Sequence, residues 1–275
     1  MLWKRVLTAL FLIPPVILGL VYGETHWVAL ISSIIILLGV HEWARLSNLH
    51  KLHQSTIYML VIIGCLVGAY WCYKQNLGMF FVYAGFIWWL FVTWLIVSAE
   101  ISGKIPQSSN VAKFFAGIFT LVPAWLSLLI LHSLDVQEGP VFLIFLFLLI
   151  WTADISGYFC GRKWGKHKLA RMISPGKTWE GVTGAIVACC LLSIGFSINK
   201  EFQLSESIIF LLICIMTVLA SIIGDLMESL LKRSAIAKDS GSILPGHGGV
   251  LDRIDSFTAA SPVFLSFITL AGLAR

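Results

Sequence analysis

Charged side chains are scarce in this chain of 275 residues. Asp, Glu, Lys and Arg make up 12% of it, whereas an ordinary soluble domain carries about 25%. The shortage excludes a soluble globular protein. Paired cysteine motifs are also lacking, because the six cysteines form no CxxC pattern and lie in or beside apolar runs. We interpret them as small core residues, neither metal ligands nor disulfide partners. No soluble domain, linker, repeat or low-complexity segment is visible.

The chain instead contains long apolar runs. Hydrophobic residues make up 58% of it, and the mean hydropathy is +0.90. The runs are about 17–22 residues long, which is the length a helix needs to cross about 30 Å of hydrocarbon. Backbone polar groups in lipid must find their partners within the segment, so these runs are expected to be helices. The sequence predicts an all-α, polytopic integral membrane protein with about nine transmembrane helices, near residues 1–23, 26–40, 57–73, 80–98, 114–132, 140–158, 182–198, 207–231 and 257–273.

The N-terminal run resembles a secretory signal, because two basic residues precede it. No small-residue cleavage site follows it, and further apolar runs come at once. We therefore interpret residues 1–23 as the first membrane helix, bent or broken at Pro14 and Pro15.

The distribution of Lys and Arg predicts the topology. With a cytoplasmic N-terminus and nine alternating helices, 16 of the 19 basic residues lie on the inner side, and Lys74, Lys200 and Arg275 lie on the other. The positive-inside rule favours this orientation, with the C-terminus outside. The net charge of +5 therefore reflects topology, and no nucleic-acid partner is expected. Ten of the 16 inner basic residues fall in segments 160–181 and 232–256, and that concentration exceeds what membrane loops need.

The stretch of residues 221–256 concentrates nine charged side chains between two apolar runs. A carboxylate at membrane depth costs roughly 2.5–3.5 kcal/mol, so several together require compensation by basic residues or by a cation. This stretch is the candidate active site.

Asp225 and Glu228 stand three residues apart and share one helix face. Glu228 and Lys232 have the spacing of a stabilising salt bridge, which remains an alternative role for Glu228. Asp225 has no base three or four residues further on. It needs another partner, and a metal ion is the obvious one.

Asp252 and Asp255 repeat this spacing at the start of the last expected helix, beside Arg253. The helix dipole alone favours an acid there by roughly 0.3–1 kcal/mol, which explains one acid better than two on one face. Oxygen ligands suit Mg²⁺, which is commonly held by one or two carboxylates and substrate phosphates. The predicted metal ligands are Asp225, Asp252 and Asp255, and Asp154 as ligand of a second cation is left open.

His247 lies in the turn before these acids. It has no cysteine at ligand spacing and cannot make a zinc site. Phosphate contact and a role in turn structure both remain open for it. Gly246, Gly248 and Gly249 would let the backbone approach a ligand closely.

The earlier basic segment begins after Asp154, near the end of an apolar helix. A structural cap or a hydrogen bond between helices remains the alternative role for Asp154. Glycines and basic residues follow it, including Lys166 and Lys177, and are typical of an anion cradle. Residues 174–178 resemble a P-loop, but Arg171 stands where that motif requires glycine. Lys177 is the strongest candidate for a phosphate contact, and a lysine at the lipid headgroups is the alternative.

Two motifs carry a resemblance to a known family. One reads Ser229-Leu-Leu-Lys-Arg-x4-Lys238-Asp239-x-Gly241-x2-Leu244-Pro245-Gly246-His247-Gly248-Gly249-x2-Asp252-Arg253-x-Asp255, and the other Ser174-Pro-Gly-Lys-Thr-x-Glu180-Gly. Both resemble the signatures of phosphatidate cytidylyltransferases (CDP-diacylglycerol synthases). The resemblance covers roughly the C-terminal half.

The resemblance implies that CTP and phosphatidate react to CDP-diacylglycerol and pyrophosphate with Mg²⁺. It also implies a homodimer in the bacterial cytoplasmic (inner) membrane, with its active site facing the cytoplasm. We expect Lys232, Arg233 and Arg253 to hold the lipid phosphate or the transition state, and Lys177 the pyrophosphate. The further expected substrate-binding residues are Ser174, Thr178, Glu180, Lys166, Lys238, Asp239, His247, Gly248 and Gly249. Residues 1–135 would form a scaffold or dimerisation region and residues 136–275 the catalytic region.

Three other functions are alternatives to this one. CDP-alcohol phosphotransferases need acids spaced four apart, which this chain lacks. A polyprenol-type lipid kinase would release ADP instead of pyrophosphate. A transporter would place acids along a path across the membrane and usually shows paired halves, whereas here the charge gathers at one face.

Overall fold

A computed structural model describes residues 18–49, 51–106, 108–135, 137–237, 239–241 and 248–273. Within these ranges the chain is almost entirely helical, which confirms the all-α expectation. The elements are α2 (Thr25–Leu46), α3 (Leu52–Lys74), α4 (Gly78–Ser102), α5 (Asn110–Ser133), α6 (Glu138–Trp164), β1 (Lys168–Ala170), β2 (Ser174–Thr178), α7 (Trp179–Asn199), α8 (Leu204–Ser234) and α9 (Leu251–Leu270).

Each expected helix after the first corresponds to one of these elements. The first expected helix, with Pro14 and Pro15, lies largely outside the described residues, so the total of nine and the orientation of the N-terminus remain predictions. Some of the predicted helices are shorter than the observed ones. α2 continues six residues beyond position 40 and so includes Glu42 and Arg45.

Seven of the described helices, α2 to α8, are long and apolar enough to cross a membrane. α9 does not reach the same hydropathy, because it faces protein more than lipid. Small and polar residues such as Ser256, Ala259, Ala260 and Ser261 are buried along it. Small side chains let neighbouring helices approach closely. α9 therefore lies inside the bundle, packed against α4, α5 and α8.

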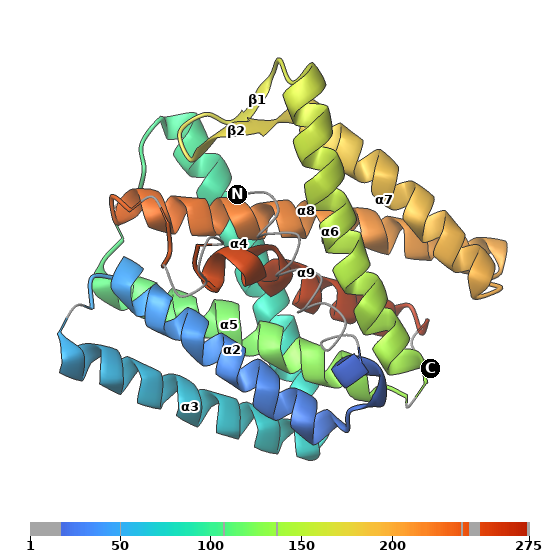
Figure 1. Cartoon of the computed structure of the whole chain (residues 1–275), viewed down its shortest axis with the longest axis horizontal. Helices are drawn as coiled ribbons and strands as arrows, with labels where there is room; N and C mark the ends of the chain where they lie inside the picture. The colour runs from blue at the N-terminus through green and yellow to red at the C-terminus, as the bar shows by residue number, and fades with distance from the viewer. Residues whose placement is uncertain are drawn as a thin grey trace.

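The helices form one bundle around α5 and α9 (Figure 1). α2 and α3 cover α5, and α6 pairs with α7. An aromatic cluster joins four helices. The ring centroid of Phe145 in α6 lies 4.3 Å from that of Phe196 in α7 and 5.1 Å from that of Phe210 in α8. The ring centroids of Phe210 and Phe264 of α9 are 6.4 Å apart. Both expected regions contribute to a single hydrophobic core. The division at residues 135 and 136 stays a prediction.

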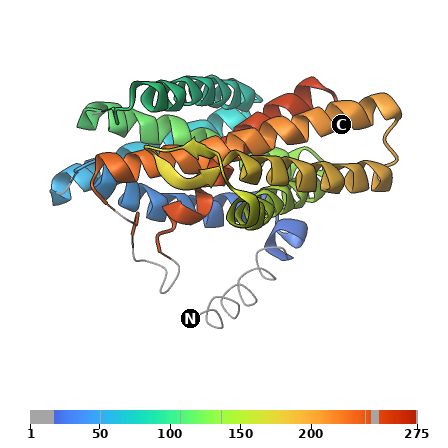
Figure 2. The ribbon, with the colours of Figure 1, turned by 90° about the horizontal axis from the view of Figure 1, so that it is seen from above.

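α8 runs the length of the molecule in both views (Figures 1 and 2). It has 31 residues, or about 46 Å at 1.5 Å per residue, which exceeds the roughly 30 Å of a hydrocarbon core. Asp225 follows Leu204 by 21 residues, about 32 Å along the axis. If Leu204 lies at one boundary of the hydrocarbon core, the acidic end of α8 lies at the other.

A small hairpin interrupts the helical pattern between α6 and α7. β1 and β2 pair antiparallel, with Lys168 opposite Thr178 and Ala170 opposite Ser174. The sequence predicted a glycine-rich loop here and no strands. The hairpin lies at one end of the bundle, where β2 contacts α8 (Figure 1).

Candidate functional site

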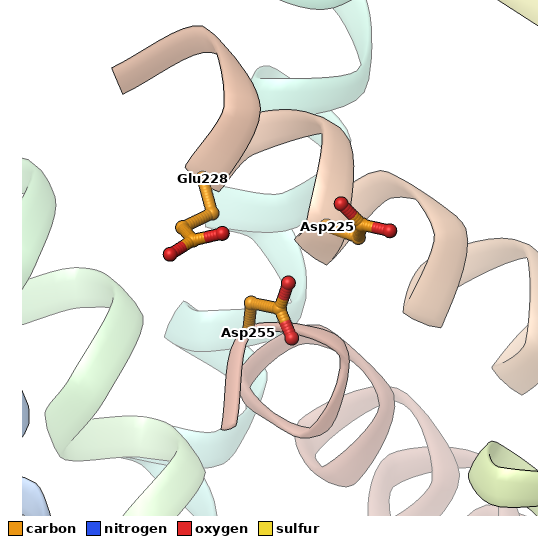
Figure 3. Close-up of side chains that lie close together, drawn as sticks. All are labelled: Asp225, Glu228 and Asp255. Atoms are coloured by element: carbon orange, nitrogen blue, oxygen red, sulfur yellow. The ribbon is translucent and has the colours of Figure 1, made fainter. Parts of the chain in front are cut away.

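Three carboxylates meet between α8 and α9. Asp225 and Glu228 lie one turn apart on α8, and Asp255 faces them from the first turns of α9. One oxygen of each lies within 4.8 Å of the others. Figure 3 shows the Asp255 carboxylate rising from α9 between the two side chains of α8. We call these three residues the acidic trio.

A glycine makes this meeting possible. A Cβ atom at Gly224 would collide with the backbone oxygen of Asp255 and lie 3.2 Å from the Ala259 Cβ. The absence of a side chain at Gly224 lets α8 and α9 approach closely. The next residue in α8 is Asp225, so the close approach brings the trio together.

Glu228 is the most buried member of the trio. Its side chain is 4% exposed, and its Oε2 accepts a hydrogen bond from Lys232 Nζ at 2.6 Å. The expected salt bridge therefore exists. Its Oε1 is buried and has no hydrogen-bond partner among the described residues. Because a buried polar atom without a partner costs about 1–3 kcal/mol, this oxygen is a candidate ligand atom for a cation.

Asp225 has a basic partner from another element. Lys177 Nζ of β2 lies 2.6 Å from Asp225 Oδ2. The same ammonium lies 3.5 Å from the backbone oxygen of Ile222. The hairpin thus supplies the base that α8 itself lacks, which the chain spacing could not indicate. Ser229 also donates to Asp225, at 3.4 Å.

Asp252, expected as a metal ligand, lies outside the trio in this structure. Both of its oxygens are occupied: Oδ1 accepts from Lys232 at 2.7 Å, and Oδ2 accepts from Ser240 Oγ and from the Gly249 N–H, each at 2.9 Å. The third carboxylate beside Asp225 and Asp255 is Glu228. Lys232 thus joins Glu228 to Asp252.

A fully buried acid from the N-terminal half holds the start of α9. Glu42 of α2 accepts hydrogen bonds from the Val250 and Leu251 N–H groups at 3.1 and 2.8 Å, and from Ser240 Oγ at 3.2 Å. Sequence reasoning missed this residue. Its one signal was an acid at the end of an apolar run in a chain that has few acids.

The same contacts explain two glycines. A Cβ atom at Gly241 or Gly249 would collide with the Glu42 carboxylate or with Ser240. These glycines therefore make room for a buried side chain of the protein itself. That the backbone at Gly249 approaches a ligand closely stays a prediction.

The expected substrate-binding residues of the hairpin have structural partners. Thr178 caps α7, since its Oγ1 accepts from the Gly181 N–H at 3.2 Å. Glu180 accepts from His167, with Nδ1 at 2.6 Å and the backbone N–H at 3.2 Å. Lys166 is exposed beside them. Thr178 and Glu180 therefore shape the hairpin.

Another carboxylate from the N-terminal half fixes the tip of the hairpin. Glu100 of α4 accepts hydrogen bonds from the Met172 and Ile173 N–H groups, at 3.0 and 2.9 Å. The Ile173 carbonyl accepts in turn from Arg233 Nε at 3.3 Å. These bonds tie the hairpin to both α4 and α8.

Two cavities are lined in part by residues of α8. A polar one of about 470 Å³ is lined by Ser174, Ser229, Lys232 and Arg233 together with Ile173, Ile236 and Ala237. An apolar one of about 490 Å³ lies between α4, α7 and α8 below the hairpin, with Trp89, Leu169, Val182 and Ile222 in its wall. Lys177 Nζ lies 3.5 Å from the backbone oxygen of Ile222, a residue that lines the apolar cavity.

The remaining predicted residues lie around this centre or beyond the described part. Asp154 of α6 is exposed and interacts electrostatically with Asp225 and Lys177. Arg253 and Asp239 are exposed at the surface. Gly248 has a φ of +84°, which favours glycine. A Cβ atom at this position would lie 3.0 Å from Asp252 Oδ2. Lys238 and His247 lie outside the described residues.

Charge at the centre is unbalanced. The trio and Asp252 bring four carboxylates within reach of two ammonium groups, Lys177 and Lys232. An excess of negative charge in a partly buried site requires a cation or protons. With oxygen ligands alone, the site suits a hard divalent cation.

Comparison with known proteins identifies the family. The model of the cytidylyltransferase family matches residues 3–271. A phosphatidate cytidylyltransferase of Pseudomonas aeruginosa is 35% identical over 277 residues, covering 99% of this chain and 98% of the relative. The enzyme of the same name from Haemophilus influenzae is 34% identical over 286 residues, with 97% and 98% coverage. An uncharacterized protein of Escherichia coli, YnbB, is 32% identical over 257 residues, with 91% and 82% coverage. The chain belongs to the cytidylyltransferase family.

Proposed function

We propose that this protein is a phosphatidate cytidylyltransferase, which converts CTP and phosphatidate to CDP-diacylglycerol and pyrophosphate. Full-length similarity to relatives with that name supports the activity. The observation that carries the chemistry is the acidic trio, set between two lysines, with a buried Glu228 oxygen that has no partner among the described residues. A site with these charges suits substrates that are themselves phosphates.

The reaction is a displacement at phosphorus. An oxygen of the phosphatidate phosphate forms a bond to the α-phosphorus of CTP, while the bond from that phosphorus to the oxygen bridging to the β-phosphate breaks. Pyrophosphate leaves with that electron pair. Because the lipid phosphate is already ionised at neutral pH, the step needs no strong general base. The main demand on the protein is to bring two anions together in line.

We propose Mg²⁺ as the cofactor, held by Asp225, Glu228 and Asp255. The fit rests on three oxygen donors within 4.8 Å of one another and on the orphaned Glu228 Oε1. When bound, Mg²⁺ neutralises phosphate charge and polarises the phosphoryl oxygens. This proposal replaces Asp252 with Glu228 in the ligand set, because Asp252 already accepts three hydrogen bonds. Asp154 remains our candidate for a second cation.

The two cavities suggest how the substrates are distributed. CTP is polar and comes from water, so the polar cavity with Lys232 and Arg233 suits its triphosphate. Phosphatidate comes from the bilayer, so the apolar cavity suits its acyl chains, and Lys177, which contacts Ile222 of the cavity wall, suits its phosphate. This arrangement reverses the sequence prediction, which gave Lys177 to the pyrophosphate and Lys232 and Arg233 to the lipid.

The finer points of location and assembly are also proposals. The lysine- and arginine-rich loops support a cytoplasmic active site in the inner membrane of a bacterium. Family resemblance supports a homodimer, which mass photometry of the protein in nanodiscs would test. A molecular mass of one chain per disc would contradict it.

Asp225→Asn tests the proposed function most directly. Purified protein in nanodiscs receives phosphatidate, labelled CTP and Mg²⁺, and CDP-diacylglycerol and pyrophosphate are measured. We expect wild type to form both products. The rate of product formation by Asp225→Asn should be at least about 100-fold lower, since metal-assisted charge stabilisation is worth several kcal/mol. Glu24→Gln, an exposed acid before α2, is the control and should stay fully active. A wild-type protein that releases no pyrophosphate would refute the function; a fully active Asp225→Asn would refute the site.

A further inference from the structure

The buried acid Glu42 is not explained by the proposed chemistry. It lies on α2, in the half of the chain expected to serve as scaffold, and is 0% exposed. Both of its oxygens accept backbone N–H groups at the start of α9. Burying a carboxylate costs several kcal/mol unless hydrogen bonds compensate it. Glu42 lies far from the trio in sequence. Its hydrogen-bond partners, however, lie next to the site.

A continuous series of polar contacts connects Glu42 to the trio. Ser240 Oγ lies 3.2 Å from Glu42 Oε2 and 2.9 Å from Asp252 Oδ2, so its single proton stands between two carboxylates. Asp252 accepts from Lys232 at 2.7 Å, and Lys232 donates to Glu228 at 2.6 Å. Each step joins a different element to the next: α2, the turn before α9, α9 itself and α8.

The series also fixes the direction of α9. Glu42 binds the N–H groups of Val250 and Leu251, which have no partner within the helix because they belong to its first turn. Asp255 follows one turn later. A shift of this turn therefore moves Asp255 relative to Asp225, and moves Asp252 away from Lys232.

We propose that Glu42 is a positioning residue for the cytidylyl transfer: it fixes the start of α9, so that Asp252 holds Lys232 against Glu228 and Asp255 stays in the trio. The proposal rests on the proposed function. It assigns Glu42 no contact with substrate or metal. Its effect is on how well the trio is arranged, which limits the chemical step and cation binding more than substrate binding.

Glu42→Gln tests this role, because glutamine keeps the shape but replaces one acceptor oxygen with an NH₂ group that cannot accept the backbone N–H. We expect kcat to fall about 10–100-fold, as for groups that orient metal ligands, with KM for CTP and phosphatidate changed less than about threefold. Binding of Mn²⁺, followed by electron paramagnetic resonance without substrates, should weaken in parallel. This second measurement does not depend on turnover.

A double-mutant cycle separates positioning from general destabilisation. If Glu42 acts through Asp252, Glu42→Gln should add little to the loss already caused by Asp252→Asn, because interacting residues are not additive. Full multiplication of the two losses would overturn the proposal. Gln203→Ala is the matched control: it removes the capping box at the start of α8, at the other end of that helix from the trio. It should lower the melting temperature and leave kcat of the folded protein unchanged.

Ser240→Ala keeps the test decisive if Glu42→Gln does not fold. It removes only the hydroxyl between Glu42 and Asp252, and we expect kcat to fall and Mn²⁺ binding to weaken. A folded Glu42→Gln, or otherwise a folded Ser240→Ala, with wild-type kcat and Mn²⁺ affinity would overturn the proposal. An inactive wild type would instead overturn the proposed function, so the two failures are distinguishable.

Discussion

At the scale of single residues, the lysines decide how the acids are used. Lys232 donates to Glu228 and Asp252, and Lys177 to Asp225. An anionic substrate can replace one of these carboxylates as partner of a lysine, because phosphate oxygens accept charge-assisted hydrogen bonds equally well. Substrate binding would thereby free a carboxylate oxygen for a cation. Under the proposed function, the ion pairs of this structure are the resting partners of groups that the substrates and the cation would engage.

Lys177→Ala should separate the two substrates. Lys177 contacts Ile222, which lines the apolar cavity, and Arg233 lines the polar one. We expect Lys177→Ala to raise KM for phosphatidate about tenfold or more while KM for CTP changes little, since one charge-assisted hydrogen bond is worth about 1.5–3 kcal/mol. Arg233→Ala should show the opposite preference. Steady-state kinetics with each substrate varied in turn measure both.

Lys74→Ala provides the control for removing a lysine. Lys74 lies at the end of α3, beside the rings of Tyr70 and Tyr73, and has no place in the site. It should leave both KM values unchanged. A Lys177→Ala variant that loses CTP affinity selectively would restore the original assignment of this lysine to the pyrophosphate.

At the scale of elements, the close contact of α8 and α9 is the critical packing feature. Gly224→Ala would push the Asp255 backbone away from α8. Overpacking of this kind typically costs about 1–3 kcal/mol. We expect a lower melting temperature and a loss of activity larger than the loss of folded protein, because Asp225 and Asp255 separate.

Gly195→Ala is the matched helical control. No atom lies within 4 Å of a Cβ placed at Gly195 in α7. The substitution should keep activity and stability, since alanine is the better helix former by about 1 kcal/mol. Equal activity of Gly224→Ala and wild type would show that the trio tolerates a wider spacing of α8 and α9.

The helices could be predicted from the sequence, but their contacts could not. Hydropathy predicts a membrane helix because all residues of such a run lie in the same apolar surroundings and are therefore apolar. The acids were found through their i, i+3 spacing, yet that spacing does not say which way a helix is turned. The spacing therefore could not show that Asp252 contacts Lys232, Ser240 and Gly249. The Lys177–Asp225 pair joins residues 48 positions apart, and no local pattern indicates such a pair.

At the scale of the whole molecule, the N-terminal half contributes to the site. Glu42 of α2 holds the start of α9, and Glu100 of α4 holds the tip of the hairpin. Both carboxylates bind backbone N–H groups of the C-terminal half. A scaffold that only supported the catalytic region through apolar contacts would not need them. The two halves therefore form one structural unit around the trio.

The orientation of this unit in the membrane is our last prediction. Glu100, near the end of α4, binds the hairpin, and the hairpin binds Asp225 through Lys177. The end of α4 and the trio therefore lie at the same membrane face. A cysteine in place of Lys104, just beyond α4, reports on that face, and one in place of Gln75, just before α4, reports on the other; both positions are exposed.

In intact cells, a membrane-impermeant maleimide should label Gln75→Cys at once and Lys104→Cys only after the membrane is opened. The unsubstituted protein gives the background from its six cysteines. The physical reason is the excess of basic residues in the loops beside the trio, which keeps them on the cytoplasmic side. The inverse labelling pattern would place the trio outside the cell, away from cytoplasmic CTP, and the proposed function would then fail for the whole molecule, however well its residues are arranged.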